Sequence, residues 1–364
     1  MGFAGDFSLG VLRTARDFDR EKLYGVCKQL TGQVDIAIAN FESIVLPAGR
    51  TSTRRMSVPV EKCGAMEDTG FTIFSIANNH ILDCGEEALL FTREFLKHSN
   101  ILSVGAGKNI VEAEQTMIME CEGKRLAFFS ATDATHYGAT RTKAGICRLN
   151  QRKLIQRVSE ERKKADLVVV SIHSDLEFTN KPAPWKMRLS RRLARAGANI
   201  IVHHHPHTLQ GIEYFEGTLI AYSLGNFVFP VNGSEYMRER EGHVEEGVFL
   251  IVEIEWCRNG KAKIGHRAIP TYIDAKNQTK LAQGIRAKTI LQNLDSYAMY
   301  LQSPRVLTRS YFQRCKIEMK NLILGSFYAF KKEGIHSAWS HVILHLRTLM
   351  HRNWIRGFFT FGFR

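Results

Sequence analysis

Long hydrophobic runs are absent from this sequence of 364 residues. No apolar stretch approaches the roughly 18 residues that a membrane-spanning helix needs. The N-terminus lacks the charged segment followed by an apolar stretch that marks a secretion signal. A myristoylation signal is also excluded, because Asp6 stands where that signal requires serine or threonine. These absences lead us to expect a cytoplasmic protein.

Cysteine is scarce and scattered. The seven cysteines are odd in number and include no Cys-x-x-Cys pair, so we expect reduced and mostly buried thiols. Internal repeats and low-complexity tracts are absent as well. A hydrophobic content of 44% and a charged content of 24% are typical of a soluble globular protein.

Positive charge is concentrated in the last quarter of the chain. The formal net charge is +14, and residues 276–364 hold 15 lysines and arginines against three acidic residues. A change in composition of this size predicts a boundary near residues 272–277. We therefore expect one domain over residues 1–275 and a basic, mainly helical region over residues 276–364.

Residues 335–351 have the clearest helical amphipathicity in the sequence, and cations alternate with aromatics in residues 352–359. One interpretation is a helix that packs its apolar side on the main domain. The other is a helix that lies on the inner face of the membrane or docks on a synthase subunit. No nucleic-acid recognition motif accompanies the basic charge, so nucleic acid is not an expected partner.

Strand-like and helix-like segments alternate along the first 275 residues. Apolar runs of strand length lie at residues 34–39, 71–76, 101–104, 166–172 and 199–202. Helical spacing occurs at residues 86–98, 151–164 and 184–196. Two hairpin patterns lie at residues 116–131 and 247–269, the second with a turn at Asn259 and Gly260. Mixed sheets flanked by helices follow from this order, although periodicity alone does not distinguish three layers from four.

Four histidines stand within five positions of the segment 202–207, which directly follows the apolar run 198–201. Imidazole is the commonest protein ligand for transition metals, and closely spaced histidines in an extended loop can direct two rings at one ion. A polar loop without a ligand is the alternative.

Other ligand-type side chains follow other apolar runs. They are Asp6, Glu42, Asn78 with Asn79 and His80, and His173. Any one of them alone is more typical of a helix cap or a turn. In open α/β sheets, however, ligand sites lie beyond the carboxyl ends of the strands. Five such strand ends together predict a site at one rim of the sheets.

These residues belong to short motifs that occur in a fixed order. The motifs are Gly5-Asp6, Asn40-Phe41-Glu42, Ala77-Asn78-Asn79-His80 with Asp83 and Gly85, His173 with Glu177, His205-Pro206-His207 and Ser223-Leu224-Gly225-Asn226-Phe227. As a set, over about residues 2 to 270, they resemble the CapA-type poly-gamma-glutamate capsule biosynthesis proteins, a branch of the calcineurin-like metallophosphoesterases. The resemblance implies a four-layer αββα sandwich, to which the charge distribution adds a basic helical C-terminal extension.

The resemblance also implies a centre of two divalent transition metals, for which manganese, iron and zinc are equally suitable. The implied metal ligands are Asp6, Glu42, Asn79, His173, His205 and His207. His80 is the implied catalytic imidazole, which stabilises the transition state or protonates the leaving oxygen. The side chains expected to orient or shape this centre are Asp83, Glu177 and Asn226. Arg54 and Arg55, in the loop over residues 47–59, are the candidate contacts for an anionic substrate.

Three positions depart from the motifs of the resembled proteins. Ser8 stands where the wider superfamily has histidine, so one metal would lack an imidazole. Asp175 and His203 each stand where the resembled family commonly has glycine. Both changes add polar bulk at the rim, and they bear on substrate scope more than on metal binding.

The expected function is that of a metal-dependent hydrolase of the phosphoesterase kind, acting on an anionic small molecule or polymer in the synthesis of capsule, poly-gamma-glutamate or another cell-envelope polymer. Two alternatives remain open. The chain is a non-catalytic assembly component that binds polymer or synthase subunits, or it makes or cleaves amide bonds at the same metals, since a two-metal site polarises carbonyls as readily as phosphates.

Overall fold

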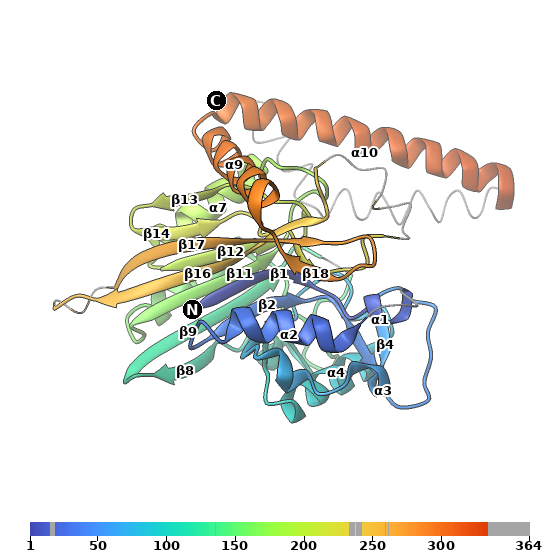
Figure 1. Cartoon of the computed structure of the whole chain (residues 1–364), viewed down its shortest axis with the longest axis horizontal. Coiled ribbons are helices and arrows are strands. Elements are labelled where there is room, and N and C mark those ends of the chain that lie inside the picture. The colour runs from blue at the N-terminus through green and yellow to red at the C-terminus, as the bar shows by residue number, and fades with distance from the viewer. Residues whose placement is uncertain are drawn as a thin grey trace.

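Two β-sheets face each other at the centre of the protein, with helices on their outer sides (Figure 1). The computed structural model describes residues 1–14, 19–134, 136–232, 237, 242–258, 260 and 262–333. The first sheet has the strand order β18 (Thr279–Leu281), β17 (Ala262–Ile273), β16 (Glu246–Trp256), β1 (Gly2–Phe7), β2 (Ala37–Phe41), β5 (Ile73–Ser75) and β6 (Leu102–Val104), and β15 (Asn226–Val228) also pairs with β1.

The second sheet has the strand order β13 (Ile212–Phe215), β14 (Thr218–Ala221), β12 (Ile200–His204), β11 (Leu167–His173), β9 (Lys124–Thr132) and β8 (Met117–Cys121). In the first sheet β1, β2, β5 and β6 run parallel, and in the second sheet β9, β11, β12 and β14 run parallel. Antiparallel strands extend both sheets, so each is mixed as predicted.

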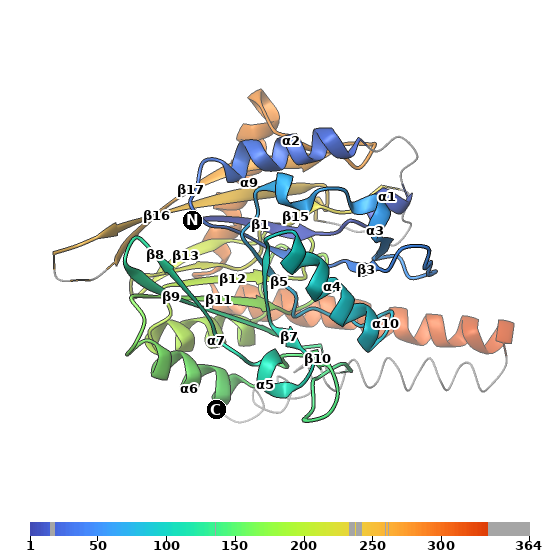
Figure 2. The same cartoon turned by 90° about the horizontal axis from the view of Figure 1, so that it is seen from below.

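The helices lie in two outer layers. Figure 2 shows α2 (Arg20–Thr31) on one side of the sheets and α6 (Gln151–Glu161) and α7 (Pro184–Arg195) on the other. α4 (Glu86–His98) packs with α2 on the outside of the first sheet, where Leu23 and Leu89 are buried in one apolar core. The short elements are α1 (Val11–Thr14), α3 (Val60–Cys63), η1 (Met66–Thr69), α5 (Ile110–Ala113), and the strand pairs β3 (Ile44–Leu46) with β4 (Ser57–Pro59) and β7 (Ala106–Gly107) with β10 (Gly145–Ile146).

The three largest apolar cores of the described residues lie between these layers. The middle core joins the two sheets through side chains such as Ile38, Val169 and Val202. The outer cores pack helices on the far side of each sheet, with Val158 of α6 and Leu193 of α7 in the second. The four-layer αββα sandwich expected for the chain is therefore confirmed.

Strand alternation decides which side chains enter the space between the sheets. Along β11, Leu167 and Val169 face the middle core, whereas Val168 and Val170 face the outer one. Because successive strand residues point to opposite faces, His173 continues the inward row at the carboxyl end of the strand. The layer that is apolar in mid-strand thus becomes polar at the strand ends.

The helices and hairpins predicted from the sequence are present. The pattern over 86–98 corresponds to α4 residue for residue, and those over 151–164 and 184–196 correspond to α6 and α7. The hairpins are β8 with β9 and β16 with β17. Asn259 of the second turn lies outside the described residues, while Gly260 adopts a left-handed φ of 76°. All seven cysteines are free and four are buried.

Beyond residue 275 the chain continues into β18 and then into α9 (Gly284–Tyr300) and α10 (Pro304–Glu333). Ile290 and Leu294 of α9 are buried in the middle core, and α10 extends past the edge of the sandwich (Figures 1 and 2). The division at residue 275 stays a prediction, and the helix predicted over 335–351 lies outside the described residues. None of the described helices has the length and apolarity needed to cross a bilayer.

Gly5 allows β1 to approach the chain that precedes β15. The Asp6 amide donates to the Gly225 carbonyl at 3.0 Å, and a Cβ atom on Gly5 would lie 2.0 Å from that carbonyl oxygen. We expect Gly5→Ala to lower the free energy of unfolding by about 3 kcal/mol, because backbone must shift to admit the methyl group. Urea denaturation measures this loss.

Gly25 provides the matched control, since it lies inside α2 with nothing within 4 Å of its added Cβ. Gly25→Ala should raise stability by about 0.5 to 1 kcal/mol, through higher helix propensity. Equal effects of the two substitutions would contradict the close approach at Gly5.

Candidate metal centre

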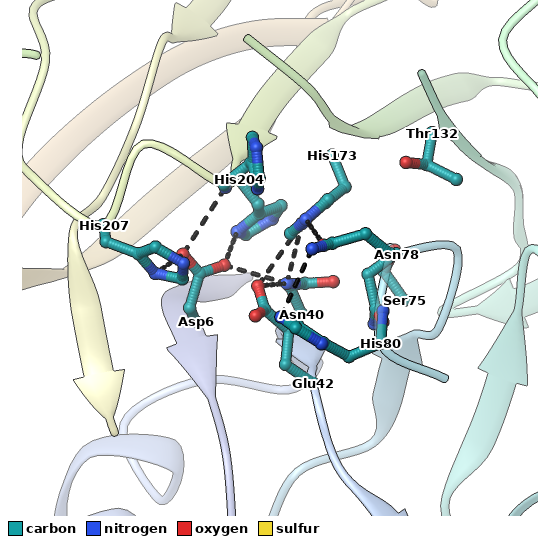
Figure 3. A network of polar contacts seen from close by, with 12 residues as sticks. Asp6, Asn40, Glu42, Ser75, Asn78, His80, Thr132, His173, His204 and His207 are labelled. Atoms are coloured by element: carbon teal, nitrogen blue, oxygen red, sulfur yellow. Dashed lines mark hydrogen bonds and ion pairs between the residues drawn. The ribbon is translucent and has the colours of Figure 1, made fainter. Parts of the chain in front are cut away.

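Polar side chains from both sheets meet at the carboxyl ends of the parallel strands (Figure 3). Asp6 on β1 and Asn40 on β2 come from the first sheet, and His173 on β11 and His204 on β12 come from the second. All four are buried. Asn40, His173 and His204 end inward-facing rows, and a register shift in β1 between Phe3 and Asp6 brings Asp6 to the same side. The four side chains form a buried polar cluster between the two sheets, called the pocket below.

Asp6 is at the middle of this pocket. Its Oδ2 lies 3.1 Å from His207 Nδ1, its Oδ1 lies 3.5 Å from His204 Nδ1, and Asn40 donates to Oδ1 at 2.8 Å. Burial alone would raise the pKa of the Asp6 carboxyl, but the contacts with His204 and His207 bring that pKa well below its usual range. Asp6 is therefore an anion in a place without solvent.

Glu42 follows β2 and is the second buried carboxylate. Its Oε1 accepts a hydrogen bond from Asn40 at 2.7 Å and lies 3.4 Å from His173 Nδ1. Within the described part of the chain, no donor reaches Glu42 Oε2, although that atom is buried. Burial and repulsion by Asp6 raise the pKa of Glu42 well above its usual value. A cation here would satisfy this oxygen and remove the repulsion.

His173 connects the two sheets across the pocket. Asn40 lies 3.1 Å from His173 Nδ1, and Asn79 Oδ1 lies 2.7 Å from Nε2. Burial lowers the pKa of His173 well below its usual value, so the ring is neutral. A neutral imidazole is the form that binds a metal ion.

The side chains form two groups of donors, each with ligand atoms within 4.8 Å of one another. The first group is Asp6, Glu42 and His173, and the second is Glu177, His205 and His207. Asp6 belongs to the first group and also contacts His207 of the second, so it lies between them. Glu177, which the sequence analysis expected to orient an imidazole, lies among the donors, with Oε1 3.9 Å from His205 Nε2.

The loop after β12 has unusual backbone geometry where it carries the second group. His205 has a φ of 96° and His207 a φ of 56°, both in the region that non-glycine residues rarely adopt. Asn226 Oδ1 lies 2.9 Å from His207 Nδ1. Because Nδ1 faces Asn226 and Asp6, Nε2 is the ring nitrogen on which an ion would replace the proton.

His80 lies beside the pocket and is partly exposed. Its Nδ1 is 2.9 Å from Asp83 Oδ2, and its Nε2 is 3.2 Å from the Asn79 amide nitrogen. Asn78 shapes the turn, because its Oδ1 accepts from the amides of both His80 and Ile81 at 3.0 Å. Asp83 thus lies where it would orient the His80 ring.

The two arginines predicted to contact substrate have different positions. Arg55 donates to the Pro230 carbonyl at 2.7 Å and is partly buried. Arg54 is exposed. Burial raises the pKa of Tyr137, the charge of Asp83 raises it further and the charge of Arg54 lowers it, so Arg54 and Asp83 both act on Tyr137.

The three departures from the motifs fall in different places. Ser8 is buried beside the pocket, where its hydroxyl donates to the Glu42 carbonyl at 3.4 Å. His203 faces away from the pocket, with Nε2 2.8 Å from Ser190 Oγ of α7. Asp175 follows β11 with a φ of 100°, a backbone conformation that favours glycine.

Sequence reasoning missed two residues of the pocket, Asn40 and His204. Both belong to motifs that the sequence analysis names. The alternation of side chains along a strand identifies them as inward-facing. Ile38 and Asn40 share one face of β2, and Val202 and His204 share one face of β12. Counting in twos from an inward apolar residue therefore predicts both.

Two buried carboxylates, several imidazoles and the amide oxygen of Asn79 form a donor set that suits divalent transition metals. Burial would lower the pKa of His207, yet the nearby charges of Glu42 and Asp6 raise it to about 10. Positive charge is thus strongly favoured in this pocket. The fold and the donors together define a two-sheet α/β protein with a candidate centre for two divalent cations.

The family model described as bacterial capsule synthesis protein PGA_cap matches residues 1–231. The chain belongs to this family, which confirms the resemblance to CapA-type proteins. It is 35% identical over 207 residues to the capsule biosynthesis protein CapA of Bacillus anthracis, covering 54% of this chain and 50% of that protein. It is 31% identical over 236 residues to the PGA biosynthesis protein CapA of Bacillus subtilis, covering 62% of each.

A probable polyglutamine synthesis accessory protein of Mycobacterium tuberculosis is 25% identical over 215 residues, covering 55% of this chain and 57% of that protein. The chain thus spans about half to three fifths of the length of these relatives. Among solved structures, the 5′-nucleotidase precursor of Thermus thermophilus aligns with a TM-score of 0.46 and 13% identity, covering 83% of this chain and 59% of that one.

Proposed function

We propose that the protein is a dinuclear metal-dependent phosphoesterase that acts in the synthesis of capsule, poly-gamma-glutamate or another cell-envelope polymer. One observation carries the proposal: two groups of metal donors lie side by side in one buried pocket, with Asp6 in contact with both. Membership in the capsule synthesis family supports the biological context.

The proposed ligands divide between the two groups. Asp6, Glu42 and His173 would hold one ion, with Asn79 beside His173, and His205, His207 and Glu177 would hold the other, with Asp6 between the ions. Two such ions, about 3.5 to 4 Å apart in proteins, clamp a phosphoryl group and supply hydroxide near neutral pH. Manganese, iron and zinc remain equal candidates for the metal.

His80 is the proposed catalytic imidazole. It is partly exposed at the pocket, its Nδ1 is held by Asp83, and its Nε2 points to Asn79. With Nδ1–H donating to Asp83, the neutral ring accepts a hydrogen bond at Nε2, and the imidazolium form would donate a proton from Nε2 to an oxygen of the substrate. Asp83 would hold the ring in the orientation that both forms need.

Elemental analysis and turnover test the proposal together. Purified untagged protein should contain close to two moles of manganese, iron or zinc per chain and should hydrolyse a phosphoester such as p-nitrophenyl phosphate. His80→Ala should keep the metals and lose about 10²-fold in kcat. Protein that binds no metal after reconstitution would refute the metal centre.

An assembly role is the second candidate, because one relative carries the name of an accessory protein for polymer synthesis. The basic region over residues 276–364 would then contact a synthase subunit or the anionic membrane surface. Loss of such contacts on truncation after residue 333, which keeps β18, α9 and α10 in place, favours assembly over catalysis if the metal sites are intact and the full chain has no turnover. Turnover that survives the truncation favours the enzyme.

Arg54 is proposed to attract the anionic group of the substrate. We expect Arg54→Ala to raise KM for an anionic phosphoester about fivefold and to leave kcat within twofold, since an exposed guanidinium contributes to binding in the ground state and transition state alike. Steady-state kinetics at low ionic strength measures both constants. Arg141→Ala is the control, because Arg141 is exposed too. A fall in kcat with unchanged KM would rule out this role.

A further inference from the structure

A buried ion pair lies under the first turn of α7, behind the candidate metal centre. Lys186 and Asp175 have side chains that are 0% and 1% exposed, and Lys186 Nζ lies 3.4 Å from Asp175 Oδ2. The same ammonium donates to Gln210 Oε1 at 3.0 Å. The sequence patterns gave no sign of a buried lysine here, since lysine on an amphipathic helix ordinarily faces solvent.

Lys186 contacts two loops that are separate in the sequence. Asp175 belongs to the loop after β11, and its Oδ2 also accepts from the Ala183 amide at 2.9 Å, where α7 begins. Gln210 belongs to the loop after β12, and its Nε2 donates to the Thr179 carbonyl of the first loop at 2.8 Å. The ammonium therefore joins the loop after β11 to the loop after β12.

These two loops carry all three donors of the second group. Glu177 lies two residues after Asp175, and His205 and His207 precede Gln210 in the other loop. The distance between Glu177 and the two imidazoles depends on how the loops are held together. Asp175 and His205 both have φ near 100°, so the loops are not in relaxed conformations and need contacts that hold them.

Stability alone does not account for this ion pair. Removing two charges from water is expensive, and apolar side chains of similar volume often stabilise a protein as well or better. A cation in the first turn of a helix is also opposed by the helix dipole. His203 also contacts α7, through Ser190 at 2.8 Å. Asp175 and His203 therefore both connect α7 to the strand ends.

We propose that Lys186 is a positioning residue that ties the Glu177 loop to the loop of His205 and His207 and so sets the affinity of the second donor group for a divalent cation. This inference rests on the proposed metal centre. The first group, Asp6, Glu42 and His173, has no residue on these loops and should be little affected.

Metal titration of the full chain tests the inference. The apo protein is titrated with Zn²⁺ and with Mn²⁺ by calorimetry, and two dissociation constants are fitted. Lys186→Met should weaken one of the two ions about 10-fold to 100-fold and leave the other within about threefold. His205→Ala identifies the second group, because it should weaken the same ion. Lys164→Met, at an exposed lysine, should leave both constants unchanged.

A charge-neutral double variant keeps the test valid where the single variant does not fold, since Lys186→Met leaves Asp175 buried without its partner. Asp175→Asn with Lys186→Met removes both charges, and asparagine accepts a positive φ. The double variant should fold and show the same selective loss of one ion. Wild-type affinity for both ions, with or without a lower melting temperature, would overturn the inference and leave the metal centre standing. A wild-type protein that binds neither ion would overturn both.

Discussion

Replacing Asp6 with asparagine should abolish both metal binding and turnover, the largest effect expected from any single substitution in this chain. Asp6 Oδ1 and Oδ2 face different histidines, and the carboxylate lies between the two donor groups. Asparagine keeps the shape of the side chain but removes the negative charge that offsets two cations. We expect metal content to fall from two ions to fewer than one per chain, and kcat to fall at least about 10³-fold, equivalent to about 4 kcal/mol.

Two measurements separate this result from a general loss of structure. Circular dichroism and urea denaturation should show a folded Asp6→Asn protein, because the pocket loses a buried charge whose partners are hydrogen-bonding side chains. Asp68→Asn, at an exposed position of η1, should retain two ions and full turnover. An Asp6→Asn protein with two bound ions would show that Asp6 is not the shared ligand.

The sequence predicted the parts of this centre that end apolar runs. Asp6, Glu42 and His173 each follow a run that is buried on both sides, so their position at the strand ends followed from hydrophobicity alone. Which sheet each strand joins did not follow, because apolar periodicity reports burial and not the partner. The four-layer arrangement came from the family resemblance and was then confirmed by the three apolar cores.

Residues held by loop conformation were harder to predict. Glu177 reaches the imidazoles because the loop turns at Asp175 and Phe178, both with positive φ. Aspartate tolerates such a turn without requiring it, and phenylalanine does not signal one. Lys186 is buried because Asp175 and Gln210 surround its ammonium, contacts between segments far apart in sequence. By contrast, Asn40 and His204 follow from strand parity, so their omission was a failure to apply a rule that the sequence already contained.

Removing the metals should destabilise the protein strongly. The effect of Glu42→Gln on the melting temperature should differ in direction between the metal-loaded and the metal-free protein. Ions at about 1,000 times their dissociation constant add about 4 kcal/mol to folding, so chelation should lower the melting temperature on the order of 10 °C. In metal-loaded protein, Glu42→Gln removes a ligand and should lower the melting temperature. In metal-free protein the same change removes a buried carboxylate next to Asp6 and should leave the melting temperature equal or higher.

The pH dependence of the metal-free protein sharpens this test. The folded pKa of Glu42 is raised by burial and by Asp6, so the folded state binds its proton more tightly than the unfolded state. The contribution of Glu42 to the free energy of unfolding is therefore complete below pH 4.5, its ordinary pKa, and is lost as the pH rises through the folded pKa. The advantage of Glu42→Gln should accordingly grow with pH above 4.5 in metal-free protein only. Glu67→Gln, at an exposed glutamate, should show neither effect. If Glu42→Gln lowered the melting temperature equally with and without metal, the repulsion between the two buried carboxylates would not be what the cations relieve.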